Sequence, residues 1–216
     1  MAPMPWRLLS VDIDGTLTLV HGWRRIAEAF GRLPAYEDSN RRFFAHELGE
    51  DPHLDDLLDL AAGHTIPEVE AVLAATPKLA GIRDGIAALH ADGVRVALLT
   101  HNPPYVCAWY ARTFGFDDFE GTVGTTLAGG RLVRPAPVHA DKRGGARRLA
   151  ARAGVPLDSM VHAGDGASDA EVFREVGGGV AVNAALPEVE RAAGVAVRTR
   201  DFADLVAALR SLPPRP

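Results

Sequence analysis

The chain has 216 residues, of which 47% are hydrophobic and 24% charged, and its formal net charge is −5 at pH 7. This balance is typical of a globular protein and excludes disordered, collagen-like and membrane-embedded chains. Because a mildly acidic chain has no general attraction for nucleic acid or for anionic membranes, we expect neither as a partner, and a phosphorylated ligand would need a local site.

The first half of the chain is predicted to consist of one strand followed by helices. Residues 6–13 are rich in Leu, Val and Ile and end at an acidic turn, which indicates a buried strand. Residues 21–79 then show helical periodicity without a convincing strand. Within them, residues 65–68 (TIPE) have the form of a capping box for a helix that runs to Ala75. This helical segment interrupts the strand pattern and is predicted to be an inserted lid, with a hinge at residues 76–77.

The second half alternates between apolar strands and helices. Strands are expected at residues 94–100, 160–163, 180–182 and 195–197, and helices at residues 83–91, 103–114, 142–153, after Gly166 and at 201–212. Residues 125–133, with Gly129 and Gly130 in the middle, predict a small hairpin. Because such alternation favours a mostly parallel sheet flanked by helices, we predict an α/β fold.

Acidic and hydroxyl side chains follow three of the predicted strands, at residues 12–16 (DIDGT), 100–102 (THN) and 164–169 (GDGASD). Ligands of parallel α/β sheets bind beyond the carboxyl ends of the strands. We therefore expect four carboxylates to converge on one rim, those of Asp12, Asp14, Asp165 and Asp169. Their mutual repulsion calls for a hard cation, and Mg²⁺ prefers a few carboxylates together with water and phosphate oxygens. The pattern predicts Mg²⁺ and a small phosphorylated substrate at one site.

Lys142 is one of only two lysines, the other being Lys78. It begins a predicted helix, whose exposed N–H groups favour anions, and its ammonium can bridge a carboxylate and a phosphate as a compact point charge. Thr100 offers a hydroxyl to a phosphate oxygen.

Taken together, these residues resemble the motifs of the haloacid dehalogenase (HAD) superfamily of phosphatases. Residues 12–18 (DIDGTLT) resemble its first motif, Thr100 its second, Lys142 its third and residues 164–169 its fourth, in the right order. The inserted segment is similar to the C1-type cap of the phosphoserine phosphatase branch. The resemblance implies a Rossmann-like HAD core at residues 1–18 and 80–216, with a helical cap at residues 19–79.

The resemblance also implies roles for the acidic residues. Asp12 would attack phosphorus and form an aspartyl-phosphate, which divides hydrolysis into two easier steps. Asp14 would protonate the leaving alcohol and then activate water. Mg²⁺ would bind Asp12, Asp165 and the backbone carbonyl of Asp14, while Asp169 would hold the metal through water or orient Lys142.

Substrate contacts follow in the same way. The phosphate is expected to meet Gly15, Thr100, His101, Asn102 and Lys142. Phosphoserine phosphatases usually carry a cap glutamate nine residues after the nucleophile, and His21 stands there in this chain. They usually have Asn where this chain has Ser168, and Gly-Gly where it has residues 101–102. His21 and Arg24 are therefore the cap residues that we expect to influence specificity.

Three functions remain open at this point. The leading one is Mg²⁺-dependent hydrolysis of a small phosphomonoester, with phosphoserine as the first candidate substrate. A phosphomutase or phosphotransferase acting on a sugar phosphate would use the same core, but such mutases carry a cap histidine where this chain has Arg24. A non-catalytic phosphate-binding regulatory domain would be expected to have lost Asp12, Asp14 or Lys142.

Histidine and cysteine give weaker signals. His46, His53 and His64 lack the spacing of a zinc site, so we expect them on the solvated surface. Cys107, the only cysteine, lies in an apolar helix and is expected in the core, and a single cysteine excludes an internal disulfide.

Because residues 1–5 do not resemble a signal peptide, we expect a cytoplasmic protein, either a monomer or a homodimer.

Overall fold

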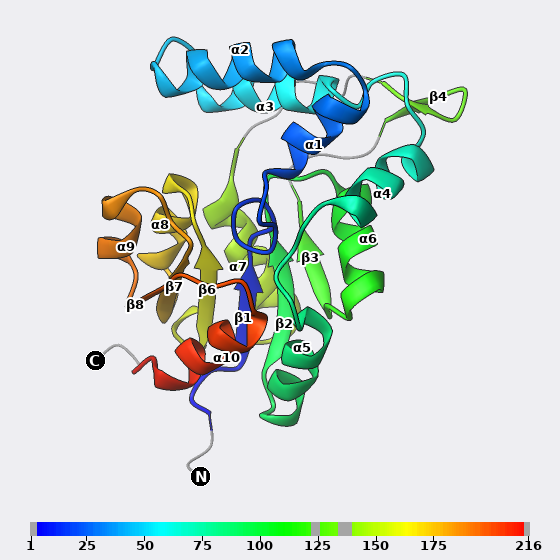
Figure 1. The fold of residues 1–216 in the computed structure, drawn as a ribbon. Coiled ribbons are helices and arrows are strands. Elements are labelled where there is room, and N and C mark those ends of the chain that lie inside the picture. Colours follow the sequence, from blue (N-terminus) through cyan, green and yellow to red (C-terminus); the bar gives the residue numbers. More distant parts are fainter. Residues whose placement is uncertain (1–3, 122–125, 134–139, 214–216) are drawn as a thin grey trace.

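A parallel sheet forms the centre of the protein, shown as a computed structural model in Figure 1, which describes residues 4–121, 126–133 and 140–213. Its six strands lie in the order β3-β2-β1-β6-β7-β8, and every neighbouring pair is parallel. The strands are β1 (Leu8–Val11), β2 (Arg95–Leu99), β3 (Asp118–Glu120), β6 (Met160–Gly164), β7 (Gly178–Val182) and β8 (Val195–Val197). The predicted α/β class is therefore confirmed.

Helices cover both faces of this sheet (Figure 1). On one face lie α5 (Ile82–Ala91), α6 (Pro104–Phe114) and α10 (Phe202–Ser211), and on the other α7 (Lys142–Ala153), α8 (Ala167–Phe173) and α9 (Pro187–Ala192), with a short 3₁₀ turn, η1 (Leu157–Ser159), before β6. Because both faces are covered, β1 has buried apolar side chains on each side: Leu9 and Val11 pack against the first group of helices, and Leu8 packs against the second. No helix in the described part of the chain has the length and apolar composition needed to cross a membrane.

Three strands differ from the prediction by more than one residue at either end. β1 covers only Leu8–Val11, because the chain turns directly after Val11 to present its acidic residues. β7 begins at Gly178, two residues before the predicted start of this strand. β3 was not predicted, because this three-residue edge strand begins with Asp118 and ends with Glu120 and has no apolar pattern.

The inserted segment folds into four helices above the carboxyl ends of the strands (Figure 1). They are α1 (Gly22–Ala29), α2 (Leu33–Phe44), α3 (Glu50–Asp59) and α4 (Ile66–Ala75). The capping box of α4 is confirmed, with Thr65 N–H donating to Glu68 at 2.7 Å and Glu68 N–H donating back to Thr65 Oγ1 at 3.4 Å. The two chain segments that enter and leave the insertion pair with each other: Leu19 N–H donates to Pro77 and Leu79 N–H donates to Leu17, both at 2.9 Å.

The predicted hairpin consists of β4 (Leu127–Ala128) and β5 (Arg131–Leu132), while Thr125, at its expected start, lies outside the described residues. The hairpin packs on the inserted helices rather than on the sheet. Gly63 N–H donates to Leu132 O, and Leu132 N–H donates to His64 O, both at 2.7 Å. The buried Leu132 side chain completes the contact.

One histidine of the insertion is buried, contrary to the expected solvated surface. His53 lies between α2 and α3, with its Nδ1 2.9 Å from Ser39 Oγ and its ring stacked on Phe43 at 4.4 Å. Ser39 Oγ also donates to Asp56 Oδ2 at 2.9 Å. Burial, together with nearby His21, lowers the pKa of His53 to about 4, although Asp56 opposes the shift. The prediction was wrong because a hydroxyl and an aromatic ring supply partners that the histidine spacing does not reveal.

Candidate active site

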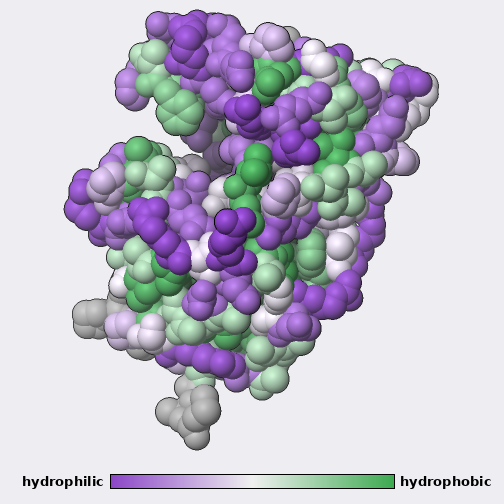
Figure 2. Space-filling view, in the orientation of Figure 1, coloured by the Kyte–Doolittle hydropathy of each residue, from purple (hydrophilic) through white to green (hydrophobic). Residues whose placement is uncertain are grey.

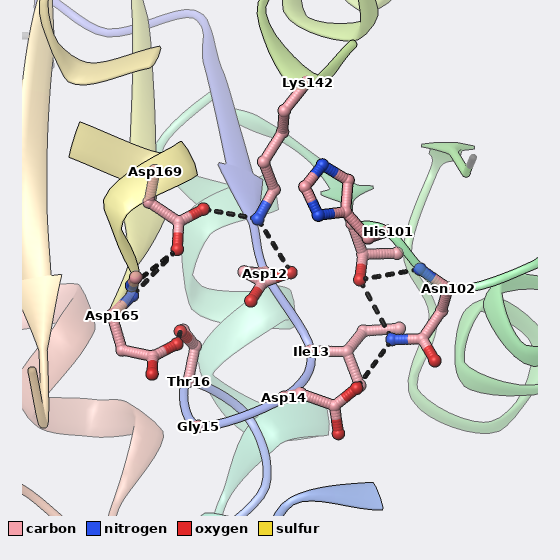
Figure 3. Close-up of polar contacts among 12 residues, drawn as sticks. Asp12, Ile13, Asp14, Gly15, Thr16, His101, Asn102, Lys142, Asp165 and Asp169 are labelled. Carbon is pink, nitrogen blue, oxygen red and sulfur yellow. Dashed lines mark hydrogen bonds and ion pairs between the residues drawn. The ribbon is translucent and has the colours of Figure 1, made fainter. Parts of the chain in front are cut away.

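The polar residues that follow β1, β2 and β6 lie together at one edge of the sheet (Figure 3). These strands are neighbours, with β1 between the other two. Asp12 and Asp14 follow β1, residues 100–102 follow β2, and Asp165 and Asp169 follow β6. Residues that are far apart in the sequence thus share one small volume.

Lys142 enters this volume as the first residue of α7. The helix begins there because Asp141 caps it, accepting from Gly144 N–H at 2.9 Å. The buried Lys142 Nζ lies 3.1 Å from Asp12 Oδ1 and 2.5 Å from Asp169 Oδ1. Burial alone would lower the pKa of Lys142, but the two carboxylates outweigh it and raise the pKa above its usual range. The ammonium therefore stays charged between them.

Asp169 is surrounded by hydrogen-bond donors. Its Oδ1 faces Lys142 Nζ and also His162 Nε2, which lies 2.8 Å away. Its Oδ2 accepts from the N–H groups of Asp165 at 3.0 Å and Gly166 at 2.9 Å. Burial would raise the pKa of Asp169, but Lys142 and His162 hold it well below its usual range. This geometry suits a carboxylate that orients Lys142.

The acidic side chains form a group that fits a divalent cation. Asp12, Asp165 and Asp169 each offer a carboxylate oxygen, and these oxygens lie within 4.8 Å of one another. Burial, with Asp12 and Asp169 nearby, raises the pKa of Asp165 to about 8, and burial raises that of Asp12 to about 6 despite Lys142. When the three carboxylates are ionised, the single positive charge of Lys142 does not balance them. Because all the donor atoms are oxygens, the group suits Mg²⁺.

The turn after β1 is shaped for this group. Gly15 has a φ of +79°, and a Cβ there would lie 2.2 Å from Asp165 Oδ2, so only glycine fits. The fully buried Thr16 donates its hydroxyl to Asp165 Oδ1 at 3.0 Å. The turn thus brings Asp165 close to the end of β1.

Asp14 is held by a residue of the β2 loop and by the insertion. Asn102 Nδ2 donates to Asp14 Oδ2 at 2.8 Å and to Thr100 Oγ1 at 3.0 Å. Gly22 N–H, at the start of α1, donates to Asp14 Oδ1 at 2.5 Å. Asn102 is one of the expected phosphate contacts, and the structure adds contacts of its amide nitrogen with Asp14 and Thr100. Sequence reasoning missed this contact because the two residues lie on different strand-end loops.

The start of α3 meets the core beside the site. Glu50 Oε1 lies 3.7 Å from His101 Nδ1, and Asp51 Oδ1 accepts from Ala140 N–H at 2.7 Å. Burial and the charge of Lys142 lower the pKa of His101 to about 3, so its ring is neutral near pH 7. Its buried Nε2 has no hydrogen-bond partner among the described residues. Figure 2 shows a recess between the overhanging inserted helices and the core on this side. Glu50 was not among the expected site residues.

The two expected cap residues face other parts of the insertion. His21 lies directly before α1, with its ring 6.0 Å from that of Tyr36. Arg24 is exposed and pairs with Glu28, with 3.0 Å between Nε and Oε1. No contact of either side chain with the strand-end loops is found in the part of the chain that the structure describes.

Comparisons with known proteins agree with this architecture. The sequence profile of the haloacid dehalogenase-like hydrolases matches residues 6–177. The chain is 32% identical over 208 residues to a phosphoserine phosphatase of Streptomyces coelicolor, a match that covers 93% of this chain and 49% of that protein. It thus spans about half the length of that relative.

Two solved structures share the fold. A HAD family hydrolase of Salmonella enterica serovar Typhi superposes with a TM-score of 0.87 at 18% identity, covering 98% of this chain and 74% of the other. A phosphoserine phosphatase, solved as a phospho-aspartyl intermediate analogue, superposes with a TM-score of 0.79 at 20% identity, covering 94% and 98%. The expected resemblance to the haloacid dehalogenase superfamily is confirmed. The chain belongs to the haloacid dehalogenase-like hydrolase family.

Proposed function

We propose that this protein hydrolyses a small phosphorylated metabolite through an aspartyl-phosphate, with phosphoserine as the first substrate to test. The observation that supports this most directly is the position of Lys142. Its ammonium bridges Asp12 and Asp169 beside an acidic group that fits a divalent cation. A positive charge held next to an ionised nucleophile is what attack on a phosphate dianion requires.

In the first step, an Asp12 carboxylate oxygen attacks phosphorus while the bond from phosphorus to the leaving oxygen breaks. Asp14 donates a proton to that leaving oxygen. In the second step, Asp14 takes a proton from water as the water oxygen attacks phosphorus, and Asp12 is released. Asn102 and Gly22 N–H, which contact the two oxygens of Asp14, would hold it in place for both transfers.

The phosphate would be held by Lys142, the Thr100 hydroxyl, His101 N–H and the turns at Gly15 and Asn102. The N–H groups of Gly15 and Asn102 donate to Thr18 Oγ1 at 3.1 Å and to Thr100 Oγ1 at 3.3 Å, respectively. A metal would be held by Asp12, Asp165 and the backbone carbonyl of Asp14, with Asp169 acting through water or through its bond to Lys142. Bound Mg²⁺ supplies charge neutralisation at the phosphoryl oxygens.

We further propose the division into a core (residues 1–18 and 80–216) and a cap (residues 19–79). The pairing of Leu19 with Pro77 and of Leu79 with Leu17 supports this boundary. The cap would exclude water and supply specificity through Glu50, with His21 and Arg24 as further candidates. Arg24, which stands where such mutases carry the cap histidine, pairs with Glu28 at 3.0 Å. A cytoplasmic location and a monomeric or homodimeric state stay predictions from the sequence.

The test is phosphate release from a panel of phosphomonoesters, phosphoserine included, with Mg²⁺ and with EDTA. We expect Mg²⁺-dependent release from one compound far above the rest, and none from Asp12→Asn, whose amide cannot act as the nucleophile. Turnover of the same compound by Asp12→Asn at the wild-type rate would contradict the nucleophile assignment. Silence of the folded wild-type protein across the panel would contradict the proposed substrate class.

A further inference from the structure

Two polar residues lie inside the central strands, where the neighbouring residues are apolar. Ser10 in β1 is directly paired in register with His162 in β6, and both side chains are fully buried. A buried hydroxyl and a buried imidazole are costly unless each is hydrogen-bonded. The step-by-step hydrolysis proposed above uses neither residue.

The two side chains form a line that ends at Asp169. Ser10 Oγ lies 2.8 Å from His162 Nδ1, and His162 Nε2 lies 2.8 Å from Asp169 Oδ1. The ionised Asp169 carboxylate can only accept, so the imidazole proton lies on Nε2. Lys142 also contacts Asp169 Oδ1, so the carboxylate is already paired with a buried cation, and the imidazole with its proton on Nε2 leaves Nδ1 as an acceptor. Nδ1 then accepts from the Ser10 hydroxyl, whose other acceptor, Val161 O, is 3.5 Å away.

The same oxygen of Asp169 that receives His162 also receives Lys142. His162 therefore limits the rotation of the carboxylate on the side that holds Lys142 against Asp12. We propose that Ser10 and His162 are a positioning pair: Ser10 holds the imidazole ring through Nδ1, and His162 in turn holds Asp169, which keeps Lys142 on the nucleophile. This inference rests on the proposed function for its catalytic consequence, but not for its hydrogen-bond pattern.

The cap offers a matched counterpart without this connection. His53 is also buried, and its Nδ1 also contacts a serine hydroxyl, but that hydroxyl donates onward to Asp56 within the cap. His162→Leu and His53→Leu both remove a buried imidazole, but only His162→Leu removes a contact to Asp169. Comparing the two variants therefore separates the general cost of losing a buried polar group from the loss of alignment at Lys142.

The first test measures the tautomer in the metal-free protein, and so does not depend on activity. Two-bond ¹H–¹⁵N correlations should show His162 protonated at Nε2 and unprotonated at Nδ1. In Ser10→Ala, Nε2 should stay protonated toward Asp169, but Nδ1 loses its hydrogen-bond donor and its ¹⁵N shift should move to that of an unbonded imine nitrogen. A proton on Nδ1 in the wild-type protein, or an unchanged His162 signature in Ser10→Ala, would overturn the pair.

The second test compares phosphate release by four variants that are first shown to be folded by circular dichroism. We expect His162→Leu to lower kcat about 10- to 100-fold, the usual effect of losing a residue that orients a ligating group, with a smaller change in KM. His162→Gln, which keeps a donor toward Asp169, should recover a large part of kcat, and Ser10→Ala should fall between His162→Gln and wild type. His53→Leu should keep wild-type kcat.

These outcomes separate the two proposals. Equal losses of kcat in His162→Leu and His53→Leu, or no recovery in His162→Gln, would overturn the positioning role while leaving the phosphatase intact. If the wild-type protein releases no phosphate, the proposed function fails, and the tautomer measurement still decides whether Ser10 and His162 are coupled to Asp169.

Discussion

Two hydrogen-bonded serine–histidine–aspartate chains, one in the core and one in the cap, use the same residue types in different roles. The core chain consists of Ser10, His162 and Asp169, and the cap chain of Ser39, His53 and Asp56. In the core chain the histidine lies in the middle and passes its hydrogen bond to the carboxylate. In the cap chain the serine lies in the middle, and its hydroxyl contacts both other members.

The difference lies in what each carboxylate meets next. The core chain ends against Lys142, which also contacts Asp12. The cap chain joins α2 to α3, so its hydrogen bonds stabilise that helix pair. Residue composition therefore does not assign a role to such a chain, whereas the neighbour at its end does.

The largest effect should come from replacing Lys142, the residue that the core chain contacts through Asp169. Lys142→Met removes the charge beside Asp12, and we expect phosphate release to fall by about 10²- to 10³-fold, as when one transition-state donor is lost. Lys142→Arg should also lose most activity, because a planar fork does not replace a point charge in that space. Steady-state phosphate release measures both variants.

Lys78→Met is the matched control, because Lys78 is the other lysine and its ammonium contacts backbone carbonyls such as Thr76 O at 2.6 Å. It should retain far more activity than Lys142→Met. Equal losses at the two lysines would mean that the core chain does not end in a reactive site.

The next effect concerns metal and pH. Without metal, the raised pKa values of Asp12 (about 6) and Asp165 (about 8) mean that the folded protein holds protons that the unfolded chain, with a carboxyl pKa of 3.8, releases. Proton binding by these two groups therefore stabilises the folded protein. The contribution to the free energy of unfolding is complete below about pH 4 and is lost as the pH rises through 6 and 8.

Mg²⁺ binds the ionised carboxylates, so its stabilisation should grow from about pH 5 to about pH 8. It should reach about 3 kcal/mol when the ion is near 100-fold above its Kd. Thermal unfolding with Mg²⁺ and with EDTA measures it. Asp165→Asn should abolish most of the increment and Asp56→Asn, in the cap chain, should preserve it. An increment that is the same at both pH values would contradict a carboxylate site.

The smallest effect concerns the cap chain. The pKa of His53 is about 4 in the folded protein against 6.5 for an ordinary histidine, because of burial and nearby His21. The unfolded chain therefore binds a proton between about pH 6.5 and 4 that the folded protein does not. The free energy of unfolding should decrease as the pH falls through this window, by at most about 3 kcal/mol from this group.

His53→Leu should flatten this slope, as measured by urea unfolding at several pH values. His101, whose pKa is also lowered, adds a slope of the same sign that persists in the variant, so the difference between the two proteins isolates His53. An identical slope in wild type and variant would show that His53 is not what makes the cap sensitive to acid.

The sequence predicted the parts of the molecule that follow from local patterns. Apolar runs placed the central strands, and the acidic turns after them placed Asp12 and Asp165, because parallel strands end at a common edge. It did not predict contacts between distant positions. Ser10 and His162 lie 152 residues apart, and their only signal is polarity within two apolar strands. The bond from Asn102 to Asp14 likewise depends on the rotamer in a loop.

The position of the hairpin has a consequence for dissecting the protein. Leu132 makes two backbone hydrogen bonds, with Gly63 and with His64, and its side chain is buried. A fragment cut at residues 19 and 79 would therefore keep all four helices but lose the partner of the α3–α4 connection. The stable unit is defined by these non-local bonds, so a graft of this cap onto another scaffold needs residues 126–133 as well as the contiguous insertion.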